Sequence, residues 1–241
     1  MIDLNNVSFS YKEAYALKDI NIRISKGEAV ALVGANGSGK STFLKLINGI
    51  VFSQKGTYSF ESREINEKVL QNSKISKIFH KKIGFVFQSA ESQLFCSTVY
   101  EEIAFGPRQM GIREEEVELR VNDCLKLLNI EELKHRTPYN LSGGEKKKVA
   151  IASVLSLNPE VLVLDEPMNG LDPRTKRFLR ELLLKLNAGG KTIICSTHDF
   201  EYVQGIFKRA IVFSKDHSII RDDEYEKVIN DEEFLIDNNI K

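Results

Sequence analysis

The chain has 241 residues, enough for one large domain or two small ones, because a domain commonly takes about 150 residues. Hydrophobic residues make up 42% and charged residues 28%, as in an ordinary soluble globular protein. The 34 Lys and Arg balance the 34 Asp and Glu, and this zero net charge argues against binding of nucleic acid or anionic lipid through bulk electrostatic attraction. No apolar run approaches the ~20 residues that cross a bilayer and no signal peptide is evident, so we expect a cytosolic chain that reaches a membrane only through a partner.

Short apolar runs alternate with helical patterns along the chain, and this order predicts a mainly parallel sheet covered by helices. Residues 2–9 and 20–24 come first and alternate apolar with polar side chains, which is typical of antiparallel strands with one solvated face. The later strands are nearly continuous in apolar residues, as buried parallel strands are. They are predicted at residues 29–33, 85–87, 161–164, 192–195 and 210–213. The pattern therefore predicts an α/β fold.

Apolar side chains at helical spacing mark segments between these strands as helices. Residues 61–82 are polar and are expected to form a solvated surface excursion. The acidic tail over residues 222–237 is expected to be an exposed helical end. No linker rich in Pro, Gly or Ser divides the chain, so we predict a single domain over residues 1–241, with a helical subdomain inserted at about residues 89–157.

A glycine-rich segment joins the first buried strand to a predicted helix. It reads Gly34-Ala35-Asn36-Gly37-Ser38-Gly39-Lys40-Ser41 and fits the phosphate-loop pattern G-x-x-x-x-G-K-[ST]. Its glycines let backbone N–H groups approach phosphates, and the N-terminus of the helix adds positive potential there. Lys40 is expected to reach the β- and γ-phosphates, Ser41 to ligate Mg²⁺, and Thr42 to contact the α-phosphate. The segment predicts a nucleoside triphosphate site; the alternative is a glycine turn that matches by chance.

A pair of acids, Asp165 and Glu166, follows the buried strand at residues 161–164. Because ligands bind at the carboxyl ends of parallel strands, this pair is expected beside the phosphate loop. Neighbouring side chains of an extended segment point to opposite sides, and the turn into Pro167 re-aims the second one. We therefore expect Asp165 to hold Mg²⁺ and Glu166 to face the attacking water. The alternative is a strand-ending turn without a catalytic role.

Two further polar residues end predicted strands and are candidates for the same site. His198 follows the strand at residues 192–195 and could hydrogen-bond the γ-phosphate and steady the water. Gln88 follows the strand at residues 85–87, and its amide could ligate Mg²⁺ or position water without adding charge. Alone, each would be an ordinary structural or surface side chain, so their assignment depends on the whole set.

A second glycine-containing turn, Ser142-Gly143-Gly144, precedes a predicted helix and is expected to form another phosphate cradle. With this turn, the phosphate loop, the acid pair and the two polar strand ends in this order, the chain resembles the ATP-binding-cassette (ABC) ATPases over residues 1–215. The resemblance implies a P-loop NTPase fold with a mainly parallel core sheet, an N-terminal antiparallel β subdomain and an inserted helical subdomain.

The same resemblance assigns roles to individual residues. Tyr11 would stack on adenine, for which a packed strand tyrosine is the alternative. Gln88 would be the Q-loop residue, Asp172 the D-loop aspartate and His198 the switch histidine. These roles imply ATP and Mg²⁺ as the cofactors of the site.

A narrower resemblance lies within residues 88–107. Gln93-Leu94-Phe95, Thr98-Val99, Glu101-Glu102 and Ala104-Phe105-Gly106-Pro107 are similar to the energy-coupling-factor and cobalt/nickel importer ATPases, which power uptake of vitamins or transition-metal ions. The chain departs from that group at residues 89–92, which read Ser-Ala-Glu-Ser where a proline and paired acids are common. It also carries Lys146 where Gln or Arg is common, and Met168-Asn169 where Thr-Ser is common.

The resemblance implies that two subunits pack head to tail, as a homodimer or as a heterodimer with a similar ATPase. Each second cradle would close over the ATP of the other subunit, and hydrolysis would reopen the dimer. The surface near residues 88–107 would pass this motion to transmembrane transporter subunits. The chain is then expected at the cytoplasmic face of the cell membrane, in a prokaryotic cell, with no nucleic acid partner.

Other classes of protein stay open at this point. The chain could be the ATPase of another ABC transporter class, or a non-transport ABC ATPase that acts as a soluble regulator or a nucleic-acid machine. Lysines at residues 74–82 and 146–148 would then supply nucleic-acid patches, although such proteins usually carry tandem cassettes or a long coiled-coil insertion. A small-molecule kinase would leave residues 141–145 and 170–173 unexplained.

Overall fold

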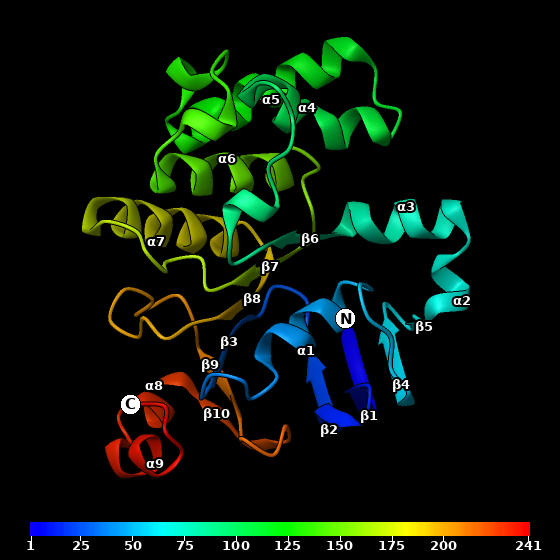
Figure 1. Cartoon of the computed structure of the whole chain (residues 1–241), viewed down its shortest axis with the longest axis vertical. Coiled ribbons are helices and arrows are strands. Elements are labelled where there is room, and N and C mark those ends of the chain that lie inside the picture. The colour runs from blue at the N-terminus through cyan, green and yellow to red at the C-terminus, as the bar shows by residue number, and fades with distance from the viewer.

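An antiparallel sheet of four strands forms the N-terminal part of the fold, in a computed structural model that describes residues 1–241 (Figure 1). Its strands lie in the order β2-β1-β4-β5, where β1 is Ile2–Tyr11, β2 is Ala14–Ile24, β4 is Lys55–Phe60 and β5 is Arg63–Glu64. Ile2 pairs with Ile24 on one side and with Phe60 on the other, and all three are buried. The alternating N-terminal pattern predicted the antiparallel strands β1 and β2 correctly, whereas β4 and β5 were not predicted.

The second sheet has six strands in the order β10-β9-β3-β8-β7-β6. They are β3 Ala29–Gly34, β6 Ile83–Val86, β7 Val161–Asp165, β8 Thr192–Ser196, β9 Arg209–Phe213 and β10 Ile219–Glu224. All neighbours pair in parallel except β10, which adds an antiparallel edge. The mainly parallel sheet is thus confirmed, and the turns that follow β3, β6, β7 and β8 leave from one edge of it.

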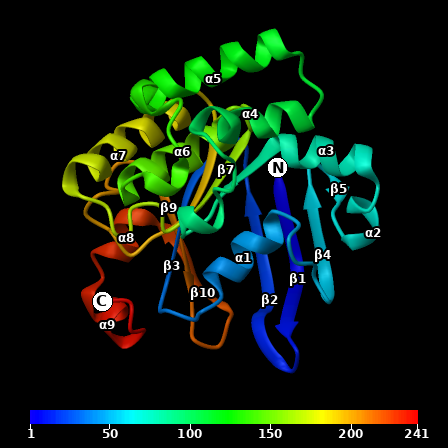
Figure 2. The ribbon, with the colours of Figure 1, turned by 45° about the horizontal axis from the view of Figure 1, so that its top comes forward.

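Helices pack on both faces of the six-stranded sheet. They include α1 Lys40–Ile47, α4 Val99–Gln109, α5 Glu114–Leu128, α6 Gly143–Leu155 and α7 Pro173–Ala188. In Figures 1 and 2, α4, α5 and α6 are grouped at one end of the molecule. None of the helices combines the length and the apolar character that spanning a bilayer requires.

Two hydrophobic clusters hold these layers together, and β3 separates them. Ala31 and Val33 belong to the larger cluster, which joins α4, α5, α6 and α7 to the sheet. Val30 and Leu32 belong to the smaller cluster, in which α1 packs between the two sheets. Successive residues of a strand point to opposite faces, so one nearly continuous apolar run serves both clusters.

The polar segment at residues 61–82 is more structured than its composition predicts. It contains β5 and two helices, α2 Glu67–Leu70 and α3 Ser73–Lys82. Ile65 and Phe79 from this segment are buried in the smaller cluster. Their burial anchors the segment, while its lysines stay on the surface.

The acidic tail is not the exposed helical end that its charge suggested. Residues 219–224 form β10, and the chain continues as α8 Tyr225–Ile229 and α9 Glu232–Asp237. Tyr225, Val228 and Leu235 are each buried in the larger cluster. The acids occupy the outer positions of these elements, so the run of charge hides an apolar inner face.

Candidate active site

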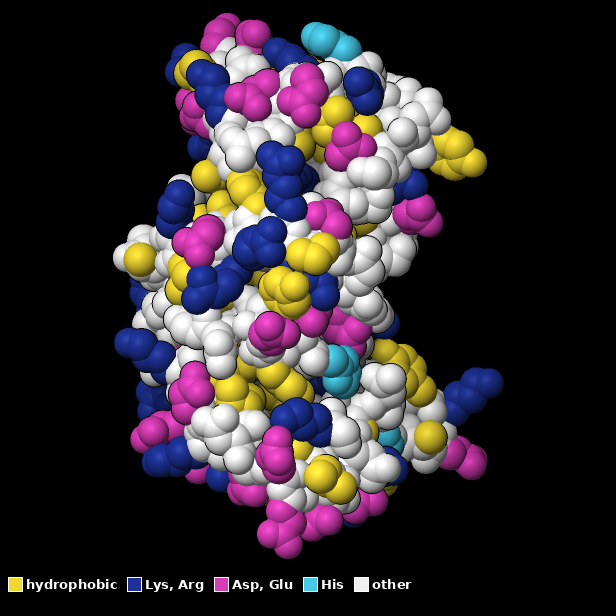
Figure 3. Space-filling model, turned by 90° about the vertical axis from the view of Figure 1, so that its left-hand side faces the viewer, with side chains coloured by type: hydrophobic (Ala, Val, Ile, Leu, Met, Phe, Trp, Pro, Cys, Tyr) yellow, Lys and Arg dark blue, Asp and Glu magenta, His cyan; other side chains and the backbone are white.

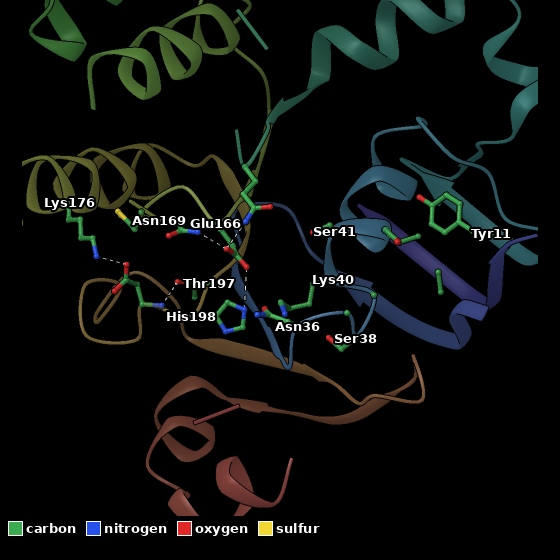
Figure 4. Close-up of a pocket in the computed structure, with 17 residues that line it drawn as sticks. Tyr11, Asn36, Ser38, Lys40, Ser41, Glu166, Asn169, Lys176, Thr197 and His198 are labelled. Carbon is green, nitrogen blue, oxygen red and sulfur yellow. Dashed lines mark hydrogen bonds and ion pairs between the residues drawn. The ribbon is translucent and has the colours of Figure 1, made fainter. Parts of the chain in front are cut away.

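A cavity of about 910 Å³ lies at the edge of the parallel sheet where β3, β6, β7 and β8 end (Figure 4). Candidate residues in its lining are Tyr11, Asn36, Gly37, Ser38, Gly39, Lys40, Ser41, Thr42, Gln88, Glu166 and His198. Candidates outside its lining are Gly34, Ser142, Gly143, Gly144, Asp165 and Asp172. The cavity therefore brings the phosphate loop together with the turns after β6, β7 and β8.

The phosphate loop depends on Gly39 at the start of α1. The φ of Gly39 is +106°, and a Cβ built on it would lie 2.3 Å from the carbonyl oxygen of Ala16. No side chain caps α1, and its first turn holds no acid, which leaves N–H groups at this end for an anion. Ser38 Oγ is buried without a hydrogen-bond partner, as fits a donor to a phosphate oxygen.

The ammonium of Lys40 is buried at the same end of α1. Its Nζ donates to the carbonyl oxygens of Gly34 at 2.6 Å and Ala35 at 3.0 Å. Burial lowers the pKa of Lys40, and the carboxylates of Glu166 and Asp165 oppose this shift. The loop thus carries a cation whose charge complements both carboxylates and a polyphosphate.

The two carboxylates at the end of β7 lie in different environments. Asp165 is buried, and its Oδ1 accepts from Ser196 Oγ at 2.6 Å. The same hydroxyl accepts from the N–H of Glu166 at 2.9 Å. Glu166 has a φ of +44°, a left-handed conformation that is uncommon outside glycine. This turn sends Glu166 into the cavity, while Asp165 stays outside its lining.

Three side chains surround the carboxylate of Glu166 (Figure 4). Its Oε2 accepts from Gln88 Nε2 at 3.0 Å and from Asn169 Nδ2 at 3.3 Å, and its Oε1 lies 3.2 Å from His198 Nε2. Burial and then the charge of Lys40 lower the pKa of His198, so its neutral form prevails at neutral pH. A neutral imidazole can still donate one N–H. These contacts fix the orientation of the carboxylate.

Oxygen donors suited to Mg²⁺ are present beside this set. Ser41 and Gln88 line the cavity, and the amide nitrogen of Gln88 donates to Glu166, which leaves its Oε1 free to bind a cation. Asp165 adds a carboxylate. A hydroxyl, an amide oxygen and a carboxylate are ligands that Mg²⁺ accepts. Because Mg²⁺ prefers octahedral coordination and commonly keeps water and substrate phosphates, such groups would complete the ligand set.

The second cradle lies at the N-terminus of α6. Ser142 and Glu145 form a reciprocal capping box, in which the Glu145 carboxylate accepts from the Ser142 N–H at 2.8 Å. A Cβ built on Gly143 would meet nothing within 4 Å, so the turn is open on its outer side. Asp172 caps α7, and its Oδ2 lies 3.8 Å from the position of a Cβ on Gly144. The N-termini of α6 and α7 therefore form one surface outside the cavity.

Tyr11 and Gly34 have different relations to the cavity. Tyr11 lines it, is 48% exposed, and contacts Phe9 edge to face with ring centroids 4.9 Å apart. A flat ring could therefore still stack on it. Gly34 packs against β9, because a Cβ built on it would lie 2.5 Å from the carbonyl oxygen of Phe213. Gly34 thus acts on the shape of the loop from outside the cavity, through its close packing on β9.

Residues that no motif singles out as site residues complete the lining of the cavity: Ala16, Met168, Asn169, Lys176, Thr197 and Asp199. Lys176 Nζ pairs with Asp199 Oδ2 at 2.7 Å, and the N–H of Asp199 donates to Thr197 Oγ1 at 3.0 Å. These bonds tie α7 to the turn that carries His198. Thr197 and Asp199 are the sequence neighbours of His198, so their place in the site could have been predicted from that adjacency. Lys176 could not, because it reaches the cavity only through the packing of α7.

Two exposed aromatic residues line a second cavity, of about 630 Å³. Phe95 is 67% exposed and Tyr139 is 84% exposed, and both line this cavity. Phe95 contacts Phe105 edge to face with ring centroids 4.9 Å apart. The buried carboxylate of Glu102 accepts from the N–H of Phe95 at 2.9 Å and holds the loop that presents it. We call Phe95, Phe105 and Tyr139 the aromatic surface, because such groupings are typical of protein contacts.

A phosphate loop at the carboxyl edge of a parallel sheet, next to a pair of carboxylates, defines a P-loop nucleotide-binding protein. The family model described as ABC transporter matches residues 17–169, and the chain belongs to this family. The match includes the phosphate loop, the turn after β6, the second cradle and the carboxylate pair. The family resemblance drawn from the motifs is confirmed.

Curated relatives extend over most or all of the chain. A putative ABC transporter ATP-binding protein of Clostridium acetobutylicum is 64% identical, with 100% of both chains covered. The nickel import ATP-binding protein LarO of Lactiplantibacillus plantarum is 44% identical, with 92% of each chain covered. The energy-coupling factor transporter ATP-binding protein EcfA of Methanothermobacter thermautotrophicus is 40% identical, over 89% of this chain and 68% of the relative.

Solved structures share the fold. CbiO1 from Clostridium perfringens, described as part of the ABC transporter complex CbiONQ, is 36% identical, with a TM-score of 0.83 over 100% of this chain and 94% of that one. A dimeric ATP-binding cassette in a post-hydrolysis state with ADP and Pi is 33% identical, with a TM-score of 0.84 over 93% of this chain and 98% of that one. The P-loop ABC ATPase fold is therefore confirmed.

Proposed function

We propose that the chain is the ATP-hydrolysing subunit of an energy-coupling-factor type importer, which takes up a transition-metal ion such as cobalt or nickel, or a vitamin. The similarity to LarO, EcfA and CbiO1 supports this class of transporter. The observation that carries the ATPase assignment is the position of Glu166, whose carboxylate is held by Gln88, Asn169 and His198 in the cavity that Lys40 also lines.

ATP binding would use the phosphate loop and Tyr11. The triphosphate would lie on the N–H groups at the start of α1, with the Ser38 hydroxyl and the Lys40 ammonium as further donors. The other loop residues in the lining would shape this cradle: Asn36, Gly37, Gly39, Ser41 and Thr42. Adenine would stack on the exposed ring of Tyr11. Bound Mg²⁺, held by Ser41, Gln88 and Asp165, would neutralise phosphate charge.

Hydrolysis would use the residues around Glu166. Glu166 would accept a proton from the water that attacks the γ-phosphate, and the products would be ADP and inorganic phosphate. His198 would donate a hydrogen bond to the γ-phosphate or the water. Gln88 and Asn169 would keep the carboxylate in place through the bonds that they already make. A base held in one orientation loses little entropy in the reaction, which favours catalysis.

A head-to-tail dimer would complete the site, because the second cradle lies outside the chain's own cavity. In such a dimer Ser142, Gly143, Gly144 and Asp172 would face the nucleotide of the other subunit. Symmetry then generates two equivalent sites. The partner would be a second copy or a similar ATPase. The whole chain would act as one domain, with helices α4 to α6 as its helical subdomain.

The aromatic surface would contact the transmembrane subunits at the cytoplasmic face of the membrane. Phe95 and Phe105 belong to residues 88–107, and Tyr139 lines the same cavity as Phe95 and as Glu91, which lies three residues after Gln88. On the face drawn in Figure 3, acidic and basic side chains are interspersed rather than gathered into a basic patch. That distribution supports docking on protein rather than on nucleic acid.

The direct experiment measures phosphate release by the purified chain with ATP and Mg²⁺, and analyses the products. We expect ADP and inorganic phosphate. Transfer of phosphate to a small molecule instead would overturn the ATPase assignment. A tagged chain expressed with its neighbouring genes should co-purify membrane subunits, and Phe95→Asp should release them without lowering basal hydrolysis more than about threefold. Retention of the membrane subunits by Phe95→Asp would overturn the docking assignment.

A further inference from the structure

Lys147 is a buried lysine one turn into α6, and its side chain is not used by the site described above. The residue is 3% exposed, and no carboxylate lies within ion-pair distance of it. Its Nζ donates to the carbonyl oxygens of Phe87 at 3.1 Å and Gln88 at 2.7 Å. Burial lowers the pKa of Lys147 to about 8, because taking a charged ammonium out of water costs free energy.

Gln93 makes the reciprocal connection from the other side. Its Oε1 accepts from the N–H of Phe87 at 3.0 Å, and its Nε2 donates to the carbonyl oxygen of Ala150 in α6 at 2.9 Å. Both backbone groups of Phe87 are therefore bound to α6: its C=O by Lys147, a residue of α6, and its N–H by Gln93, which also bonds to the backbone of α6. Phe87 directly follows the last residue of β6, so these bonds attach the turn after the strand to the helix.

The turn also reaches the reacting centre. The side chain of Gln88, whose carbonyl oxygen Lys147 binds, donates to Glu166 at 3.0 Å. At its other end α6 starts from the second cradle, whose capping box includes Ser142. A continuous set of bonds and helical backbone thus runs from the cradle through Lys147 and Gln88 to Glu166.

We propose that Lys147 is a positioning residue that couples the second cradle to Gln88, so that a nucleotide held by the cradle changes the placement of Glu166 in the same chain. The inference rests on the proposed head-to-tail dimer, in which the cradle contacts the nucleotide of the other site. Lys147 would then make the two sites of the dimer hydrolyse cooperatively. Gln93 supports the same link from the loop side.

The choice of residue type supports a holding role over simple packing. The next inward residues of α6, Val149 and Ala150, are apolar and buried. An apolar side chain at residue 147 would fill the same space without the cost of burying a charge. A long flexible side chain with three donors can instead bind two carbonyl oxygens of a turn at once.

The test compares Lys147→Met with Lys148→Met. Lys148 is the next residue of the same helix, and its Nζ lies over the ring of Phe178, 4.6 Å from the centroid. Three quantities are measured for each variant: the affinity for a fluorescent ATP analogue, kcat for phosphate release, and the Hill coefficient for ATP. For Lys147→Met we expect unchanged affinity, a fall in kcat of about 2- to 30-fold, and a Hill coefficient reduced to about 1.

Further variants separate coupling from a defect in folding. Gln93→Leu should resemble Lys147→Met, and the double variant should lose no more than the worse single variant, because both remove one link. Lys147→Gln keeps a donor without the charge, so it should fold even where Lys147→Met does not, and it should have an intermediate Hill coefficient.

Several outcomes would overturn the inference. A wild-type Hill coefficient of 1, a wild-type kcat and Hill coefficient in Lys147→Met, or an equal loss in Lys148→Met would each do so. The inference would also be overturned if kcat of the Lys147→Met/Gln93→Leu double variant fell by the product of the two single fold-changes, as expected for independent residues. Failure of the proposed function is a separate result, because then the wild-type chain itself would not hydrolyse ATP.

Discussion

His198 Nε2 lies 3.2 Å from Oε1 of Glu166, although the two residues belong to turns after different strands. The contact is possible because β7 and β8 pair in parallel with Asp165 opposite Ser196, which brings the two turns to the same level of the sheet. Ser196 Oγ then accepts from the N–H of Glu166 and donates to Asp165. The register of two strands therefore sets the geometry of the proposed base.

Glu166→Gln tests the proposed base directly. The amide has the size of the carboxylate but cannot accept the proton of the attacking water, so we expect kcat to fall on the order of 10² or more. ATP affinity should hold, because the phosphate loop supplies the binding contacts. Steady-state phosphate release and equilibrium ATP binding measure the two effects.

The matched control is Glu181→Gln, a glutamate of α7 whose side chain is 59% exposed and pairs only with Arg180. It should leave kcat within about twofold of wild type, as surface substitutions usually do. A kcat for Glu166→Gln close to that of the control would remove Glu166 from the proton transfer.

His198 should make folding stability depend on pH. Burial and the charge of Lys40 lower its pKa below the ordinary value of 6.5, so the unfolded chain binds more protons between the two values. The stability that depends on neutral His198 is therefore complete above about pH 6.5 and is lost as pH falls toward the lowered pKa. Thermal unfolding without nucleotide, compared at about pH 7.5 and about pH 5.5, should show a smaller fall in midpoint for His198→Gln than for wild type.

An exposed histidine provides the comparison for this measurement. His135→Gln changes the same residue type outside the cavity, and its midpoint should fall as much as that of wild type. If His198→Gln also fell as much as wild type, proton binding by His198 would not be linked to folding.

The phosphate loop and the acid pair could be read from the sequence because each is local. Gly34 to Ser41 form one continuous segment, and the strand before it sets its direction. Asp165 and Glu166 end an apolar run in the same way. Their side chains point in different directions because the backbone turns at Glu166. The proline that follows Glu166 indicated this turn from the sequence alone.

Other parts of the site depend on packing that no local pattern encodes. Lys176 meets Asp199 only because α7 lies beside the turn after β8, and their spacing in the chain carries no motif. The burial of the inner face of the acidic tail also depends on packing, since Tyr225 is buried by contact with distant strands and helices. In the proposed dimer the second cradle would act on the nucleotide of another subunit, and the fold of one chain does not encode that contact.

Gly39 and Gly37 give a paired test of the phosphate loop. Both have positive φ, +106° and +81°, so alanine is strained at either position. A Cβ at Gly39 would lie 2.3 Å from the carbonyl oxygen of Ala16, whereas a Cβ at Gly37 would meet nothing within 4 Å. We therefore expect Gly39→Ala to bind ATP about tenfold or more weakly than Gly37→Ala and to unfold at lower temperature. Calorimetric titration with ATP and thermal unfolding measure both; equal values for the two variants would show that close packing on Ala16 does not shape the loop.

Glu102 should control the rigidity of the aromatic surface. Its buried carboxylate accepts from the N–H groups of Phe95 at 2.9 Å and Cys96 at 2.7 Å, so Glu102→Leu leaves both donors unpaired. An unpaired buried donor costs about 1–3 kcal/mol, which the loop can avoid by opening to water. Chymotrypsin should then cleave after Phe95 about tenfold faster or more, as followed by mass spectrometry of timed digests.

Glu101→Leu is the control for this change. Glu101 lies in the same turn of α4, but its carboxylate pairs with Arg108 and is 43% exposed, so its loss frees no buried N–H. Cleavage after Phe95 should stay near the wild-type rate in this variant. Equal rates for Glu101→Leu and Glu102→Leu would show that the loop is held by packing, for which the edge-to-face contact of Phe95 with Phe105 would then be the cause.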